Sequence, residues 1–330
     1  MLFRSNQIRG RAEHILNLER ARNQLAVRTL FVQESPEERL ELALVATRAA
    51  ELYPQSWDGM LLTSGIVAGP TTYDFRMDLR AVYQHLCHNH PRPNEPQYTL
   101  SMGLPADRLM GHDDLLSRAD ECLGIRHPAA QRTAEQRQKL KTLVDVIKIP
   151  ESSVASHLNW ATFSLQDLVQ KNGGVSPLGN EGVRYTGSPD DAALNAAVPR
   201  FRASPEAVAR FAADSDHHGR FRMPVISAHA IGDPTVFVES EDTLRQRMQA
   251  AGNGDRLVQA FVDSREHSYW GDAMYPPLFN ALIEWVQNDR KPSPQSIATD
   301  CVALRAASPK DCLFRPEYTP QPLASRIAPR

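Results

Sequence analysis

The sequence predicts a protein of the α/β class, because its second half alternates short apolar runs with helical patterns. Residues 224–228 and 256–262 are apolar runs of strand length, and the helical patterns span 241–251 and 275–287. The last of these patterns carries its apolar residues on one face, as a helix that covers a sheet does. Strands that are connected through single helices with short links lie parallel in one sheet.

The N-terminal residues predict further elements in chain order. A polar helix over 11–24 is followed by a short apolar run over 27–32, and a helical pattern extends over 40–52. Tyr53-Pro54 ends this pattern, because proline disfavours helical geometry in the residue before it. The apolar residues of 60–67 then indicate a buried strand.

The middle of the chain has a different pattern. Residues 71–220 predict a mostly helical insertion, since helical stretches alternate there with loops rich in Pro, Asn and Gly and no strand alternation stands out. We therefore expect a parallel sheet, incomplete at its N-terminal side, that is built from 36–70 and 221–290. A polar segment over 1–35 would precede this core, and a Pro-rich tail over 291–330 would follow it.

The composition limits the classes of partner. A chain of 330 residues, of which 42% are hydrophobic, can bury a large core. Its formal net charge of −2 gives no reason to expect nucleic acid as a partner. No apolar run approaches the roughly 20 residues that a membrane helix needs. Leu2-Phe3 is followed at once by polar and basic residues, so the sequence contains no recognisable secretory signal.

The four cysteines fall into two local pairs, Cys87 with Cys122 and Cys301 with Cys312. An even count in two local pairs suits two disulfides, which belong in an oxidising compartment. The alternative is four free thiols in a cytosolic enzyme. The spacing alone leaves both alternatives open.

Two loops carry residues suited to catalysis. The strand that ends at Ala228 is followed by a loop with Gly232-Asp233-Pro234, and the strand that ends at Val262 is followed by a loop with His267. In doubly wound parallel sheets the reactive groups lie in loops beyond the carboxyl ends of the strands. An imidazole can take a proton from a serine hydroxyl when a carboxylate fixes its tautomer. Asp233 and His267 are therefore the candidate catalytic pair.

This series of strand, Asp loop, helix, strand, His loop and helix resembles the C-terminal part of the α/β-hydrolase family. The stretch 53–59 and the helical insertion are similar to parts of secreted bacterial members, in which the insertion is a lid over the acyl pocket. The resemblance covers roughly residues 40–330. It implies hydrolysis of a carboxylic ester through an acyl-enzyme, on a small-molecule or polymer substrate and without a cofactor. It also implies that the intact parent protein is secreted or periplasmic.

By this resemblance Asp233 orients His267, and His267 is the general base toward a serine nucleophile. Pro234 stiffens the turn after the acid. His229 is expected to have a structural role and to bond the Asp233 loop rather than to act in catalysis.

The nucleophile is the point at which the sequence departs from the family. A Gly-x-Ser-x-Gly turn is expected between a strand and the helix that ends at Tyr53, and the serine in that window is Ser35. Gln33 and Glu37 replace both glycines, and Pro36 lacks the backbone N–H that would donate to an oxyanion. Ser35 is a poor candidate nucleophile and fits better as the N-cap of the following helix.

The residues before Ser35 are too few and too polar to hold the strands that precede the nucleophile in the family. We therefore expect a chain that lacks the N-terminal part of its fold, through a truncated or chimeric gene. The alternative to a serine hydrolase is a non-catalytic α/β-hydrolase-like binding protein or an inactive fragment.

Other clusters predict no further site. His85, Cys87, His88 and His90 bring four metal-ligand types together, but the two-pair spacing typical of zinc sites is absent, and we expect no metal. His217-His218 lies in a polar loop and is expected to be solvated. No Gly-rich phosphate loop precedes a helix, so no nucleotide cofactor is expected.

Overall fold

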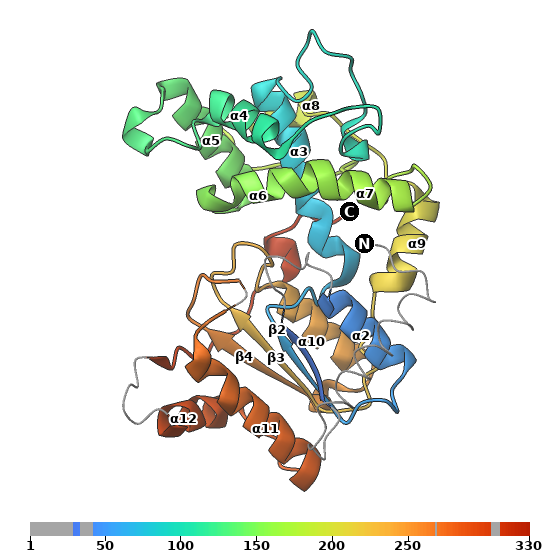
Figure 1. Cartoon of the computed structure of the whole chain (residues 1–330), viewed down its shortest axis with the longest axis vertical. Coiled ribbons are helices and arrows are strands. Elements are labelled where there is room, and N and C mark those ends of the chain that lie inside the picture. The colour runs from blue at the N-terminus through green and yellow to red at the C-terminus, as the bar shows by residue number, and fades with distance from the viewer. Residues whose placement is uncertain (1–28, 34–41, 268, 305–310) are drawn as a thin grey trace. The chain divides into compact units, whose positions relative to one another are not determined.

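The computed structural model of the protein (Figure 1) describes residues 29–33, 42–267, 269–304 and 311–330. The chain divides into two compact units. The helical unit comprises Tyr73–Ala212 and Ala324–Arg330, and the sheet unit comprises Ala213–Leu323 and the described residues of 3–72. The predicted helix over 11–24 and the candidate Ser35 lie outside the described residues. The division into domains drawn from the sequence stays a prediction.

The sheet unit is built on a parallel sheet. The described residues form four strands in the order β1-β2-β3-β4, which is also their order in the chain. These strands are β1 (Thr29–Gln33), β2 (Gly59–Thr63), β3 (Val225–Ala230) and β4 (Leu257–Val262). Every residue of β2 and β3 is buried, because helices cover both faces of a parallel sheet. The predicted α/β class with a parallel sheet is confirmed.

Helices cover the two faces of this sheet in pairs (Figure 1). The helices of the sheet unit are α2 (Leu42–Leu52), α10 (Ser240–Ala250), α11 (Tyr275–Asn288) and α12 (Pro294–Leu304). Met60 and Leu62 pack with apolar residues of α2 and α10. Leu61, which points to the other face, packs with apolar residues of α11 and α12. The alternation of side chains along a strand thus divides the core into two layers.

Helix α12 lies within the Pro-rich tail, where the sequence predicted no regular element. Pro294 begins the helix, a position that tolerates proline because its missing N–H has no helical partner. Just before it, the hydroxyl of Ser293 accepts a hydrogen bond from the N–H of Ser296 at 3.0 Å. The proline therefore marks the start of a helix rather than an irregular tail.

Strand β2 is shorter than the predicted strand over 60–67. Ser64 follows its last residue and adopts a left-handed backbone with φ of 55°. The N–H of Ser64 still donates to the carbonyl of Ala228 at 2.9 Å. At Gly65 an added Cβ would lie 2.8 Å from the Cβ of Ala43, so the chain passes close to α2 there. Ile66 and Val67 are buried, but outside any strand.

The helical unit contains no strand among the described residues of 73–212, as the sequence predicted for this segment. Its helices are α3 (Asp74–Cys87), α4 (His112–Leu123), α5 (Ala134–Ile147), α6 (Val154–Asn159), α7 (Leu165–Lys171), α8 (Asp191–Ala197) and most of α9 (Pro205–Ser215). The last three residues of α9 belong to the sheet unit. A π-helical turn over Trp160–Ser164 joins α6 to α7. Among the helices that the structure describes, none has the length and apolar character needed to cross a membrane.

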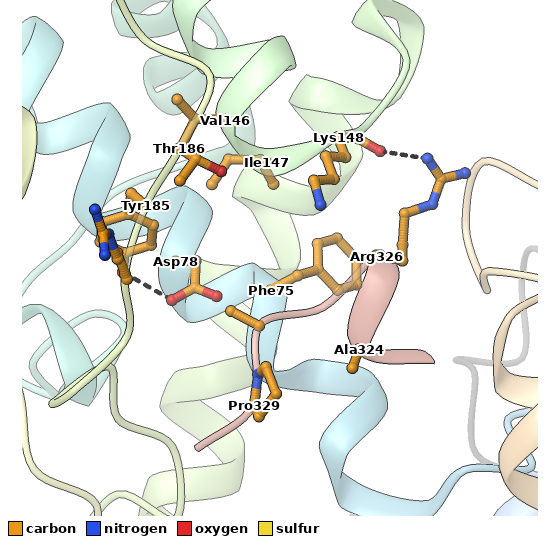
Figure 2. Close-up of a pocket in the computed structure, with 12 residues that line it drawn as sticks. Phe75, Asp78, Val146, Ile147, Lys148, Tyr185, Thr186, Ala324, Arg326 and Pro329 are labelled. Atoms are coloured by element: carbon orange, nitrogen blue, oxygen red, sulfur yellow. Dashed lines mark hydrogen bonds between the residues drawn. The ribbon is translucent and has the colours of Figure 1, made fainter. Parts of the chain in front are cut away.

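The last residues of the chain belong to the helical unit. Arg330 pairs with Asp78 on α3 at 3.0 Å, and Lys148 donates to the carbonyl of Ser325 at 2.6 Å. A cavity of about 230 Å³ lies between this segment and α3, with Phe75, Asp78 and Tyr185 among its lining residues (Figure 2). Burial raises the pKa of Asp78, and the charge of Arg330 partly offsets this effect.

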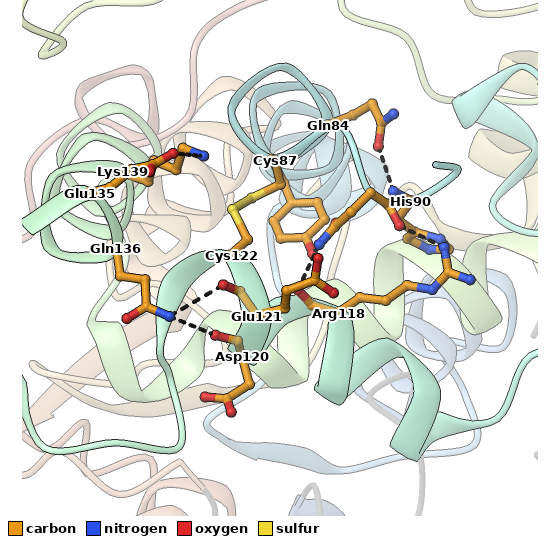
Figure 3. The surroundings of a disulfide bond; sticks show 12 residues. Gln84, Cys87, His90, Arg118, Asp120, Glu121, Cys122, Glu135, Gln136 and Lys139 are labelled. Atoms are coloured by element: carbon orange, nitrogen blue, oxygen red, sulfur yellow. Dashed lines mark hydrogen bonds and ion pairs between the residues drawn. A yellow bond between two sulfur atoms is a disulfide. The ribbon is translucent and has the colours of Figure 1, made fainter. Parts of the chain in front are cut away.

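Both predicted disulfides form, and the alternative of four free thiols is wrong. Cys87 at the end of α3 is bonded to Cys122 on α4, and Cys301 on α12 is bonded to Cys312. Beside the first of these bonds, Gln84 accepts a hydrogen bond from the backbone N–H of His90 at 3.0 Å (Figure 3).

Within the described part of the chain, no group of three His, Cys, Asp or Glu side chains could hold a metal ion.

His217 is buried, which corrects the prediction that it is solvated. Its Nε2 donates to the carbonyl of Val67 at 2.7 Å, and its Nδ1 accepts from the N–H of Gly219 at 3.2 Å. These two bonds need the neutral ring. Burial accordingly lowers the pKa of His217 to about 4. His218 is exposed, as predicted.

The two disulfides are expected to differ in their contribution to stability. Cys87 and Cys122 are 35 residues apart and Cys301 and Cys312 only 11, so the loop-entropy relation gives roughly 4 and 3 kcal/mol. We expect replacement of the first pair by serine to lower the free energy of unfolding more than replacement of the second, as measured by urea denaturation. A larger loss for the Cys301–Cys312 pair would contradict this order.

His217 is expected to make the sheet unit acid-sensitive. Because its folded pKa lies below its usual value of 6.5, its contribution to stability is complete above pH 6.5 and is lost as the pH falls through about 4. His217→Gln keeps a donor for the Val67 carbonyl but cannot titrate. We expect urea midpoints between pH 7 and 4.5 to fall less steeply in His217→Gln than in the wild type, with His218→Gln as the control. Equal slopes would argue against the buried neutral imidazole.

Candidate active site

The loops that follow β3 and β4 are hydrogen bonded to each other. In the sheet, Ala230 lies opposite Val262, so both strands end at the same level. The N–H of Gly232 then donates to the carbonyl of Ser264 at 2.9 Å. A Cβ at Gly232 would lie 3.0 Å from that same oxygen and 2.8 Å from Cγ of Arg265. The glycine before the acid is therefore needed for the close approach of the two loops.

The carboxylate of Asp233 is buried and held from two sides. Its Oδ1 accepts hydrogen bonds from the N–H groups of Thr235 at 2.8 Å and Val236 at 3.0 Å. Its Oδ2 lies 2.8 Å from Nδ1 of His267. Burial raises the pKa of Asp233, but hydrogen bonds from His229 and His267 outweigh it and lower the pKa to about 2. Asp233 is thus a carboxylate at neutral pH.

His267 lies in the loop after β4, with 12% of its side chain exposed. Because Nδ1 faces the Asp233 carboxylate, Nδ1 carries the proton and the neutral ring has its lone pair on Nε2. Trp270 donates from its indole N–H to the carbonyl of Glu266 at 3.1 Å and holds the loop next to His267. The structure therefore brings the two predicted loop residues together in the tautomer that a general base needs.

A second histidine and a second acid lie behind Asp233. His229, on β3, has its Nε2 at 3.3 Å from Oδ2 of Asp233 and at 2.9 Å from the carbonyl of Val236. Its Nδ1 lies 3.2 Å from Oε1 of Glu241, on α10. The side chains of His229 and Glu241 are completely buried. The contact with Val236 agrees with the expected role of His229 in holding the Asp233 loop.

Glu241 was not predicted from the sequence to belong to the site. A glutamate in the first turn of a helix rich in charged residues resembles an ordinary surface residue. The available signal was a pair of polar residues within the apolar strands, Ser227 and Gln259, because both are hydrogen bonded to Glu241. The hydroxyl of Ser227 donates to Oε1 of Glu241 at 2.8 Å, and Nε2 of Gln259 donates to its Oε2 at 2.8 Å. A buried polar side chain on a strand implies a buried partner.

Two serines are candidates for a nucleophile. Ser35 belongs to the segment between β1 and α2, which is outside the described residues. Ser64 was not considered from the sequence. It follows β2, is completely buried, and its hydroxyl makes no hydrogen bond with any residue that the structure describes. Its left-handed φ of 55° is unusual for a residue with a side chain and costs backbone energy.

Comparisons with known proteins find a distant likeness among solved structures. No protein-family model and no curated protein matches the chain. Among solved structures, feruloyl esterase B from Aspergillus oryzae is similar with a TM-score of 0.30 and 10% sequence identity. The similarity covers 76% of this chain and 59% of the esterase chain, so the chain spans less than two thirds of that protein.

Gly232→Ala tests the link between the two loops. The added Cβ would meet a backbone oxygen at 3.0 Å, and overpacking of this kind costs about 1–3 kcal/mol. We expect a lower urea midpoint, with a disturbed imidazole N–H signal of His267 in NMR spectra. The control is Gly111→Ala, where the new Cβ would meet only the Asp114 side chain at 3.6 Å. Equal effects of the two substitutions would show that the loops do not depend on the glycine.

Proposed function

We propose that the chain is a serine hydrolase that cleaves carboxylic esters through an acyl-enzyme. The hydrogen bond of 2.8 Å between Asp233 Oδ2 and His267 Nδ1, on loops that follow two neighbouring parallel strands, carries the proposal. A carboxylate and an imidazole in this relation form the acid and base of a serine triad whatever the fold around them. Catalytic groups at the carboxyl edge of a parallel sheet are also the rule in such sheets.

The proposed reaction assigns one step to each group. His267 Nε2 takes the proton of a serine hydroxyl as the serine oxygen attacks the ester carbonyl, and Asp233 stabilises the imidazolium. The imidazolium then gives this proton to the leaving alcohol, and an acyl-serine remains. A water molecule, deprotonated by the same nitrogen, attacks the acyl group and releases the acid. The serine regains its proton from His267, so the enzyme is restored.

The proposed nucleophile is either Ser35 or Ser64. In favour of Ser35, it belongs to the link between a strand and a helix, β1 and α2, where serine nucleophiles of this reaction class occur. Against it, Pro36 has no N–H for the oxyanion. In favour of Ser64, its backbone is left-handed and it follows β2, which is the neighbour of β3. Against Ser64, its side chain is completely buried.

We also propose that the helical unit is a lid that selects the substrate, a small-molecule or polymer ester. Its main segment is inserted in the chain between β2 and β3, as lids are in the family that the sequence resembles. Two disulfides support a secreted or periplasmic location, because such bonds persist in oxidising compartments. A non-catalytic binding protein is the second candidate function, and Pro36 after Ser35 is the observation that favours it.

A fluorophosphonate probe tests the proposal, since it labels serines that an adjacent base activates. We expect labelling of the wild type, a loss of roughly 10³-fold or more in labelling rate in His267→Ala, and a similar loss in Asp233→Asn. Peptide mapping and the variants Ser35→Ala and Ser64→Ala then identify the nucleophile. His127→Ala, which alters an exposed histidine of the helical unit, is the control. A folded wild type that is not labelled would favour the binding protein.

A further inference from the structure

Asp233, His229 and Glu241 form a buried chain of charged groups behind His267. The side chains of all three have no exposed surface. Oδ2 of Asp233 is the atom that both imidazole rings share, at 2.8 Å from His267 Nδ1 and 3.3 Å from His229 Nε2. Glu241 lies on the far side of His229, at 3.2 Å from its Nδ1. The four side chains therefore lie in the order His267, Asp233, His229 and Glu241.

Both ring nitrogens of His229 face hydrogen-bond acceptors. Nε2 faces the carbonyl oxygen of Val236 and the carboxylate of Asp233, and Nδ1 faces the carboxylate of Glu241. A neutral imidazole has one N–H and could serve only one side. Both ring nitrogens must carry a proton to donate to the acceptors that they face, so the contacts fit an imidazolium.

The surroundings of Glu241 agree with this protonation state. Its Oε1 accepts from the hydroxyl of Ser227 and its Oε2 accepts from the side-chain amide of Gln259, both at 2.8 Å. With donors at both oxygens, Glu241 is held as a carboxylate that accepts from His229 rather than as an acid that donates to it. The charges around His229 come from the loop after β3 and from α10, with His267 beyond Asp233. Burial lowers the pKa of His229, but Asp233 and Glu241 outweigh this effect and raise it to about 10.

We propose that His229 is a positioning residue that acts on His267 through Asp233. It is an imidazolium fixed by Glu241, and it shares Oδ2 of Asp233 with His267. Its charge therefore weakens the electrostatic attraction between Asp233 and a protonated His267. A carboxylate with no other cation beside it favours the protonated form of a neighbouring imidazole. A second cation on the same carboxylate oxygen reduces this effect. The proton affinity of His267 is then lower than it would be beside Asp233 alone. This proposal depends on the proposed function only in naming His267 as the base.

The test is a pH titration of the full chain, labelled with ¹⁵N-histidine and followed by NMR of the ring nitrogens. In the wild type we expect His229 to show two protonated nitrogens throughout pH 5–8, while His267 titrates. In His229→Gln we expect the apparent pKa of His267 to rise by about one unit, a tenfold change in proton affinity. His218→Gln, the same substitution at an exposed position of the same unit, should leave the titration of His267 unchanged.

A second variant covers the case in which His229→Gln does not fold. In Glu241→Gln the imidazolium of His229 loses one of its two carboxylates, so we expect its pKa to fall and His229 to titrate at lower pH than in the wild type. An unprotonated ring nitrogen on His229 in the wild type at pH 7 would overturn the proposal. So would an unchanged pKa of His267 in a folded His229→Gln protein.

These readouts do not need catalytic activity, so failure of the two proposals can be distinguished. If the NMR result holds and the probe labels no serine, the charged chain exists and the hydrolase proposal fails. If the probe labels the wild type, the pH dependence of the labelling rate gives a second measurement. We then expect the acid limb in His229→Gln to move to higher pH by the same unit as the His267 titration.

Discussion

The close approach of two loops at the carboxyl edge of the sheet is the constraint on which the candidate site depends. Parallel pairing of β3 with β4 ends both strands at one level, with Ala230 opposite Val262. Gly232 then lets the loops meet without a side chain between them. The contact of 2.8 Å between Asp233 and His267 follows from this backbone arrangement. The backbone of the two loops thus fixes the relative position of the proposed acid and base.

Buried charge is handled differently in the two units. In the sheet unit, an imidazole lies between the carboxylates of Asp233 and Glu241, and the acid that contacts His267 stays ionised to low pH. In the helical unit, burial raises the pKa of Asp78 although Arg330 lies 3.0 Å away. Depth of burial does not explain the difference, because Asp233 is at least as deeply buried as Asp78. The difference lies in the larger number of donors that surround the carboxylate of Asp233. In the sheet unit, the carboxylate with the lowered pKa is therefore the one that contacts His267.

The parts of the fold that the sequence predicts are those with a clear hydrophobic period. The elements from β3 to α11 were predicted within a few residues, because apolar runs and amphipathic patterns alternate there without interruption. Helix α12 was missed, since its flanking prolines suggested an irregular tail. The early end of β2 was missed as well. The apolar residues Ile66 and Val67 follow those of β2 closely in the sequence, and the turn at Ser64 takes them out of the sheet.

In the candidate site, too, the sequence predicts the residues that a local pattern indicates and misses the others. Asp233 and His267 could be found because they follow strands, and the order of strands and loops is a local property of the sequence. Glu241 was missed, because a buried glutamate and a surface glutamate look alike in a helix rich in charged residues. The signal for it lay elsewhere in the sequence, in Ser227 and Gln259 on the strands. His217 was placed wrongly for a related reason. Its partner is the carbonyl of Val67, 150 residues away in the chain, and neither residue indicates the other.

The membership of Ala324–Arg330 in the helical unit has a consequence for the evolution of this architecture. A segment inserted into one loop can be exchanged between relatives as a cassette with two junctions. Here the inserted part also depends on the end of the chain, since Arg330 pairs with Asp78 and Ser325 accepts from Lys148. A cassette taken without those last residues would leave Asp78 buried without its cation. The insertion and the C-terminal residues are therefore expected to be inherited together.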